Sequence, residues 1–140
     1  MKHKLIFFFA AGLLLMGLIG CTPKDAHSFE RAGYWKGSNN RIFIIYMKRP
    51  QDVSAIIEYA NRLPHTSGRT THAFFFSSPV RWGNSVTLAR DFDHAYDIID
   101  SQRRAGASWD FFYAKGLGVR GTVFVDCRHN RESSACTATR

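Results

Sequence analysis

The residues closest to a catalytic arrangement lie near the C-terminus, where Asp126, Cys127 and His129 follow one another closely. A cysteine beside a histidine and an acid suggests a nucleophile with its general base. Neighbouring residues at the end of a strand, however, point to alternate faces. Cys136 also offers this cysteine a disulfide partner, which would leave no thiolate to attack a substrate. We therefore expect no cysteine nucleophile.

The segment GLGVRG, with glycines at positions 116, 118 and 121, matches the G-x-G-x-x-G pattern of dinucleotide-binding sites. Such a site needs a helix that starts at the glycines, so that its amides face the pyrophosphate. It also needs an acid about 20 residues later for the ribose. Here a strand pattern follows instead, and the sequence reaches Arg140 at that distance. We expect a tight hairpin turn and no bound cofactor.

Histidines and aspartates could hold a metal ion, but their spacing does not favour one, because the sequence has no H-x-H or H-E-x-x-H pattern. We expect surface or loop positions for His65, His72, His94 and His129. Asp93, Asp97 and Asp100 would share one flank of a helix, with Arg104 in the i, i+4 position that pairs with Asp100. We expect a solvated, salt-paired flank and no metal site.

Trp82 stands between two strand-like segments, residues 72–80 and 84–90, which we interpret as a hairpin. A tryptophan at a hairpin tip is hard to bury, and exposed aromatic residues beside arginine are typical of interface anchors. We therefore predict Trp82 and Arg81 as contacts for a partner. The alternative is that Trp82 folds back over its own hairpin.

The N-terminus has the three parts of a secretory signal: Lys2 and Lys4, an apolar run over residues 5–20, and the small residue Gly20 before the break. A membrane-spanning helix needs about 20 apolar residues, and this run is shorter. The final residues, Leu-Ile-Gly-Cys at 18–21, resemble the lipobox of bacterial lipoproteins. The resemblance implies cleavage after Gly20 and a diacylglyceryl, palmitate-type modification of Cys21. Several acyl chains hold a protein in a bilayer permanently.

The residue after the cysteine is Thr22 rather than aspartate. By resemblance to enterobacterial lipoproteins, this implies sorting to the outer membrane. Assigning Cys21 to lipid leaves Cys127 and Cys136, which can pair in an oxidising periplasm. We expect this disulfide to staple the C-terminal tail.

The chain has 19 lysines and arginines, and removal of Lys2 and Lys4 with the leader leaves 17 against 11 acidic residues. This excess favours anionic partners. The basic residues are dispersed, without a block of five or more, which is typical of solvated surface. We expect no nucleic-acid partner.

Periodicity predicts the elements that position these residues. Residues 41–48 read as a central strand, and residues 53–60 as a helix with one apolar stripe. A second helix follows over residues 91–104, and residues 109–115 and 120–127 form a hairpin. With the hairpin around Trp82, the order β-α-β-β-α-β-β predicts an α+β, ferredoxin-like (split βαβ) sandwich with two helices on one face of an antiparallel sheet. A thioredoxin-like order of elements is the alternative, but the sequence has no redox cysteine pair directly after its first predicted strand, residues 41–48.

We thus expect a leader at residues 1–20, a lipidated tether at 21–40 and one α+β domain at 41–140. Both faces of the strands carry apolar residues, so the second face should be covered or used. We predict a non-enzymatic, periplasm-facing lipoprotein that serves as an interaction component of an envelope assembly of the secretion, conjugation or pilus type. Alternatives are binding of an anionic envelope polymer or lipid through a basic surface, and a hydrolase assembled from distant residues.

Overall fold

The computed structural model describes residues 28–116 and 121–137. Its elements are β1 (Phe29–Gly37), β2 (Asn40–Met47), α1 (Val53–Asn61), β3 (Thr71–Phe76), α2 (Gly83–Thr87), α3 (Phe92–Arg104), β4 (Phe111–Lys115), β5 (Thr122–Asp126) and α4 (Ser134–Thr137). The expected leader, Cys21 and Gly118 lie outside the described residues. Among those described, no helix has the length and apolar character that a membrane span requires.

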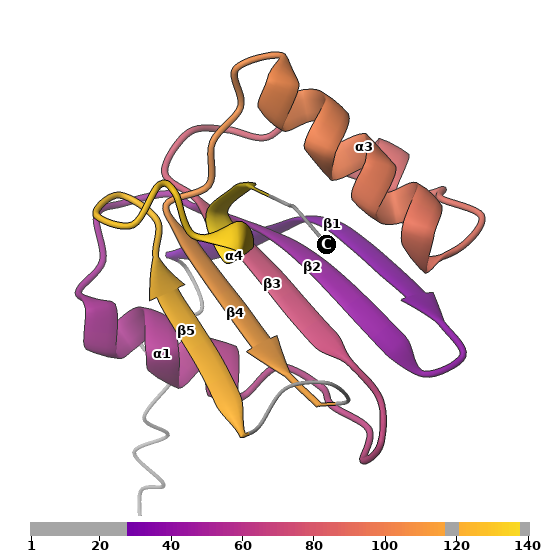
Figure 1. The fold of residues 1–140 in the computed structure, drawn as a ribbon. Helices are drawn as coiled ribbons and strands as arrows, with labels where there is room; N and C mark the ends of the chain where they lie inside the picture. The colour runs from indigo at the N-terminus through magenta and orange to yellow at the C-terminus, as the bar shows by residue number, and fades with distance from the viewer. Residues whose placement is uncertain (1–27, 117–120, 138–140) are drawn as a thin grey trace, which may run out of the picture.

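The five strands form one sheet in the order β1-β2-β3-β4-β5 (Figure 1). β2 and β3 are parallel and are connected through α1, whereas the other three neighbouring pairs are antiparallel. The α+β class is therefore confirmed, but the expected antiparallel sheet is wrong. In a split βαβ unit another strand lies between the two parallel strands, while here β2 and β3 are direct neighbours.

Strand β1 occupies residues that we expected to be a tether, so the predicted domain boundary at residue 41 is wrong. Ser38 and Asn39 both have positive φ, +47° and +64°, and form the two-residue turn of a β1–β2 hairpin. A register shift between Arg31 and Gly33 interrupts the alternation of buried residues along β1. This irregularity hid the strand from a search for period-2 patterning.

The predicted strand at residues 84–90 is also wrong, because α2 takes its place. Helix α2 packs on the outer strand β1 through two glycines: a Cβ on Gly33 or on Gly83 would collide with the backbone of the other segment. The hydroxyl of Thr87 accepts a hydrogen bond from the Tyr34 amide at 3.0 Å. This contact satisfies a backbone donor that an outer strand otherwise leaves to solvent.

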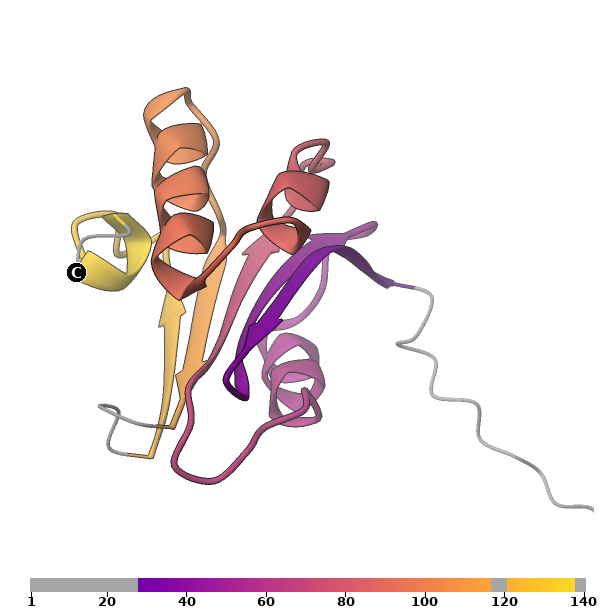
Figure 2. The ribbon, with the colours of Figure 1, turned by 90° about the vertical axis from the view of Figure 1, so that its right-hand side faces the viewer.

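The helices cover both faces of the sheet rather than one (Figure 2). Ile56 and Ala60 of α1 pack on one face, in a core cluster that includes Phe75. Ala95 and Ile99 of α3 pack on the other face, together with residues of α2 and α4. We name these the α1 face and the α3 face. The apolar residues on both sides of the strands are thus explained, since each side has its own core.

The second predicted helix and the final hairpin are confirmed as α3 and as β4 with β5. Asp91 caps α3 by accepting a hydrogen bond from the His94 amide at 2.7 Å. At the other end Arg104 forms the expected i, i+4 ion pair with Asp100, at 3.0 Å.

Cys127 and Cys136 form a disulfide, with their Cα atoms 5.4 Å apart. The bridge fixes α4 against the α3 face. There, the indole Nε1 of Trp109 donates a hydrogen bond to the Ala135 carbonyl at 3.1 Å. The expected staple of the C-terminal tail is confirmed.

Candidate functional site

Trp82 and Arg81, the predicted partner contacts, lie at the start of α2 rather than at a hairpin tip. The Trp82 ring packs edge-on against Phe76, with centroids 5.6 Å apart, and belongs to the border of the α3-face core. Trp82 therefore has a packing role in this fold, as in the alternative in which it folds back. Arg81 beside it is exposed.

The Asp126, Cys127 and His129 group forms no nucleophile, because the sulfur of Cys127 is in the disulfide. Arg128 holds the Asp126 carboxylate with two hydrogen bonds, from Nε at 3.0 Å and Nη2 at 2.7 Å, and its guanidinium stacks on Phe111 at 4.3 Å. The Arg128 hydrogen bonds, with a smaller one from His129, hold the pKa of Asp126 below its usual range. The arrangement is a structural ion pair between Asp126 and Arg128. The contribution of Arg128 was not predicted from the sequence.

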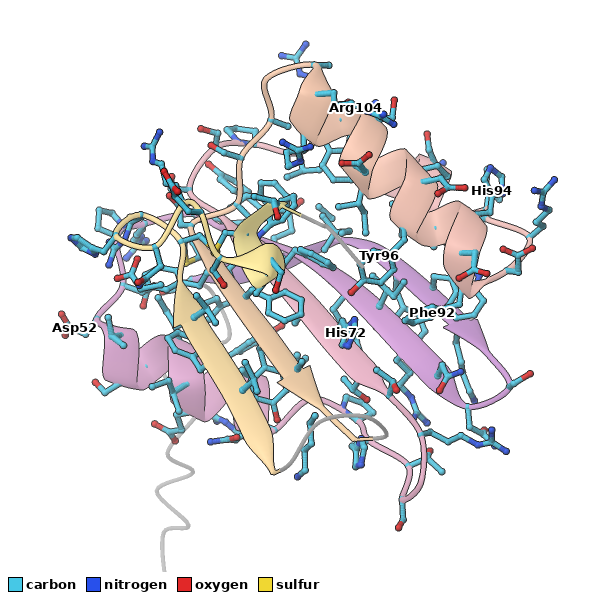
Figure 3. The ribbon with its side chains drawn as sticks, viewed as in Figure 1. Asp52, His72, Phe92, His94, Tyr96 and Arg104 are labelled. Atoms are coloured by element: carbon cyan, nitrogen blue, oxygen red, sulfur yellow. A yellow bond between two sulfur atoms is a disulfide. The ribbon has the colours of Figure 1, made fainter. Side chains whose placement is uncertain are left out.

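His72 is a half-buried histidine within strand β3, in contrast to the expected surface or loop position. It lies on β3 and faces Phe92 and Tyr96 of α3 (Figure 3), with its Nδ1 hydrogen-bonded to the Tyr96 hydroxyl. Burial lowers the pKa of His72 to about 4. At neutral pH the ring is uncharged. Within the described residues, no group of three or more histidine, cysteine, aspartate or glutamate side chains could hold a metal ion.

A groove of ≈ 440 Å³ opens on the α1 face beside β1. Its lining residues are mostly aromatic: Phe29, Arg31, Tyr34, Phe43, Tyr59, Leu63 and Pro64. We name it the aromatic groove. Phe29 stacks on Tyr59 with centroids 4.2 Å apart, and Tyr34 lies 4.8 Å from Phe43. The two phenylalanines are buried, but both tyrosines are half-buried and can be reached from solvent.

The rim of the aromatic groove is cationic. The guanidinium of Arg31 lies over the Tyr34 ring, 5.2 Å from its centroid. Burial raises the pKa of Tyr59, against the opposing effects of Arg31 and Arg62, so its hydroxyl keeps its proton at neutral pH. The groove can therefore receive an apolar side chain and offer hydrogen bonds and positive charge around it.

A row of basic side chains crosses the same face at the end of the sheet where β2 and β3 begin. Lys36 lies directly opposite Arg41, Arg41 is paired with Thr71, and Thr71 with Lys115. Paired residues point to one face of a sheet. We name Lys36, Arg41 and Lys115 the basic row. No acidic side chain among the described residues forms an ion pair with any of the three.

His65 lies over Thr71, in the middle of the basic row. The Thr71 hydroxyl donates to the Pro64 carbonyl at 3.2 Å, and its oxygen is left to accept a hydrogen bond from Nδ1 of His65, also at 3.2 Å. Burial, followed by the charges of Lys115 and Arg41, lowers the pKa of His65. The neighbouring cations thus already disfavour a further positive charge.

The aromatic groove and the basic row are continuous. The Tyr34–Phe43 pair of the groove and the Lys36–Arg41 pair of the row follow each other on the same face of the β1–β2 hairpin. Sequence analysis missed this surface because it assigned residues 21–40 to a tether. The sequence did hold a signal for this hairpin. Gly37, Ser38, Asn39 and Asn40 stand between two apolar segments, and such small polar residues are typical of hairpin turns.

The surface combines an apolar hollow with cations that have no acidic partner among the described residues, an arrangement that can bind a ligand. Comparison with known proteins identifies no relative of the chain: no family model, no curated protein and no solved structure matches it.

Proposed function

We propose that this chain is a non-enzymatic envelope lipoprotein, anchored in the outer membrane through lipid on Cys21, that docks a protein partner at its aromatic groove. The observation that carries the proposal is the pair of half-buried tyrosines over a phenylalanine floor, rimmed by Arg31. Tyrosine and arginine are the residue types that dominate the binding energy of protein interfaces.

The start of the domain supports the anchoring part of the proposal. Residues 22–28 separate Cys21 from β1, and an extended chain spans at most about 3.5 Å per residue. The domain would therefore stay within roughly 25 Å of the lipid. A partner in the same envelope layer would meet the aromatic groove without diffusing to it.

Crosslinking in cells tests the docking surface. A benzophenone-bearing amino acid in place of Tyr34 in the full-length protein is expected to capture a protein partner at native abundance. The control position is Ser101, which is exposed on α3 and lies over the opposite face. Failure to capture any protein from Tyr34, or equal capture from both positions, would contradict the proposal.

The anchor has its own test. Cys21→Ser should give an uncleaved or soluble protein that leaves the membrane fraction, while Cys127 and Cys136 stay bonded to each other. Thiol labelling after export measures whether Cys127 and Cys136 are still bonded to each other. A lipid-free wild-type chain at position 21 would refute anchoring without affecting the docking proposal.

A second candidate function is binding of an anionic envelope polymer or lipid, and the basic row is the observation that favours it. Such binding would weaken steeply with salt, because exposed charges are screened within about 10 Å at 0.1 M ionic strength. Co-sedimentation with lipopolysaccharide and with cell-wall glycan at low and high salt measures this. Salt-independent retention would contradict it.

A further inference from the structure

We propose that the occupant of the aromatic groove is an extended, acidic segment of the partner, whose apolar side chains enter the groove while its carboxylates bind the basic row. This inference rests on the proposed docking function and adds the chemistry of the partner. It uses Lys36, Arg41 and Lys115, none of which has an ion pair with an acidic side chain among the described residues.

The basic row lowers the stability of the folded protein. Like charges directly opposite each other on neighbouring strands are destabilising. Lys36 and Arg41 are such a pair, and no described acidic side chain compensates them. Placing a cation at this position therefore brings no gain in folding. An anionic ligand would convert the repulsion into attraction.

The guanidinium of Arg41 is held in place by two hydrogen bonds. Its Nη1 donates to the Asn39 carbonyl at 3.1 Å and to the Thr66 hydroxyl at 2.8 Å. No hydrogen bond of the described residues uses Nε or Nη2, which together form the side-on edge of the guanidinium. This edge matches a carboxylate in a bidentate arrangement. A pre-oriented donor loses little side-chain entropy on binding.

The spacing of the cations in the basic row favours an extended peptide over a phosphate headgroup. Arg41 and Lys115 lie two strands apart, about 10 Å at the usual strand separation. Alternate side chains of an extended peptide are about 7 Å apart, so that two flexible carboxylates can reach both cations. One phosphate group is too small to bridge them.

The position of the row relative to the anchor points the same way. Lys36 lies near the end of β1 that is remote from Phe29, which follows the anchored segment. Lys36 is seven positions after Phe29 along the strand, about 23 Å at 3.3 Å per residue. A row built to bind the headgroups of the anchoring bilayer would be expected at the Phe29 end.

Crosslinking from Tyr34 in the full-length protein tests the inference when it is combined with a charge-removing triple variant, Lys36→Gln, Arg41→Gln and Lys115→Gln. The control removes two exposed cations that have no ion pair among the described residues and that lie outside every predicted contact surface: Arg49→Gln and Arg131→Gln. We expect the row variant to lose at least tenfold in crosslinking yield, and the control less than twofold. Unchanged thermal midpoints exclude unfolding.

A binding assay with the purified full chain in detergent supplies an independent arm. The probes are a peptide in which two phenylalanines and then two glutamates occupy every second position, so that all four side chains face the same side, its glutamine counterpart, and vesicles of phosphatidylglycerol. We expect the acidic peptide to bind at least tenfold more tightly than the glutamine peptide. Because a carboxylate at the row would favour protonation of His65, its NMR-measured pKa should rise with the acidic peptide and not with the glutamine peptide.

The outcomes separate the inference from the docking proposal. A partner captured equally by wild type and row variant would overturn the inference and leave the docking function intact. Absence of capture from Tyr34 would refute the docking function, and equal binding of the two peptides would overturn the inference in either case. Tighter binding of vesicles than of the acidic peptide, lost in the row variant, would assign the row to lipid and also overturn it.

Discussion

The two ends of the sheet both carry cations, but among the described residues only one end pairs them with acids. Where β2 and β5 finish, Lys48 contacts Glu30 at 2.9 Å and Arg128 contacts Asp126 at 2.7 Å. We name this the paired end; it also holds the disulfide of the C-terminal tail. At the other end the basic row has no acidic partner among the described residues.

The difference separates cations that serve the fold from cations that remain available. A paired cation at the end of a strand fixes the chain that follows it, as Arg128 does through Asp126 and the ring of Phe111. A cation with only like-charged neighbours adds nothing to folding. Net charge alone hides this distinction, because it sums both kinds.

The largest expected effect is at the paired end, on removal of the disulfide. Cys127→Ser with Cys136→Ser should lower the free energy of unfolding by about 3 kcal/mol, from the entropy that a loop of roughly 10 residues regains in the unfolded chain. Urea unfolding measures it. Crosslinking from Tyr34 should persist under conditions where the variant is folded, and its loss there would show that the two ends are coupled.

Acid should lower the stability of the end that holds the basic row, and it should do so through His72. His72 is the residue after Thr71 on β3. Its pKa is lowered from 6.5 to about 4, so the unfolded chain binds the proton first and stability falls as pH drops through this window. Between pH 7 and pH 5 the expected loss is about 2 kcal/mol.

His72→Gln keeps an acceptor for the Tyr96 hydroxyl and removes the titration, so its free energy of unfolding should vary less over the same pH range. Asp126 at the paired end has a lowered pKa, and its stabilising charge is lost only well below this range. Equal pH dependence in wild type and variant would mean that His72 titrates normally.

A smaller effect is expected when the ion pair of the paired end is broken. Arg128→Gln should lower the free energy of unfolding by about 1 kcal/mol, the upper part of the range for partly exposed pairs, because the guanidinium is bidentate and stacked on Phe111. Chemical denaturation measures it. A change in the free energy of unfolding below about 0.2 kcal/mol would show that the ion pair of Arg128 does not stabilise the fold, so the two ends of the sheet would not differ in this respect.

The smallest effect, and the one of opposite sign, is expected at the basic row. Lys36→Gln relieves repulsion with Arg41 and should leave the free energy of unfolding unchanged or raise it by up to about 0.5 kcal/mol. The same denaturation assay at low salt measures this. A loss of 1 kcal/mol would show that Lys36 serves the fold after all.

Sequence patterning predicted the elements whose period is regular. The stripes of α1 and α3 were identified, as were Asp91 at the start of α3 and Arg104 near its end, because each has a local physical cause. The disulfide followed from counting cysteines. These features depend on near neighbours in the sequence, which is why they could be predicted.

What could not be predicted depends on contacts between distant segments. The bulge after Arg31 interrupts the alternation of β1, and α2 packs on β1 through the close approach of Gly33 and Gly83, which are 50 positions apart in the sequence. The candidate site was missed with them, because Lys36 and Arg41 become neighbours only when β1 pairs with β2.

The packing of α2 on β1 through Gly33 and Gly83 has a mechanical consequence if the chain is anchored at Cys21, as proposed. Tension from the membrane would load β1 at Phe29 and peel the outer strand from β2, beginning at the rung with Met47. The Gly33–Gly83 contact and the bond from the Tyr34 amide to Thr87 lie between that point and Lys36. Peeling would meet a second set of contacts there, so the part of β1 from Tyr34 to Lys36 would stay paired with β2, whereas Phe29 and Arg31 in the lining of the aromatic groove would separate first.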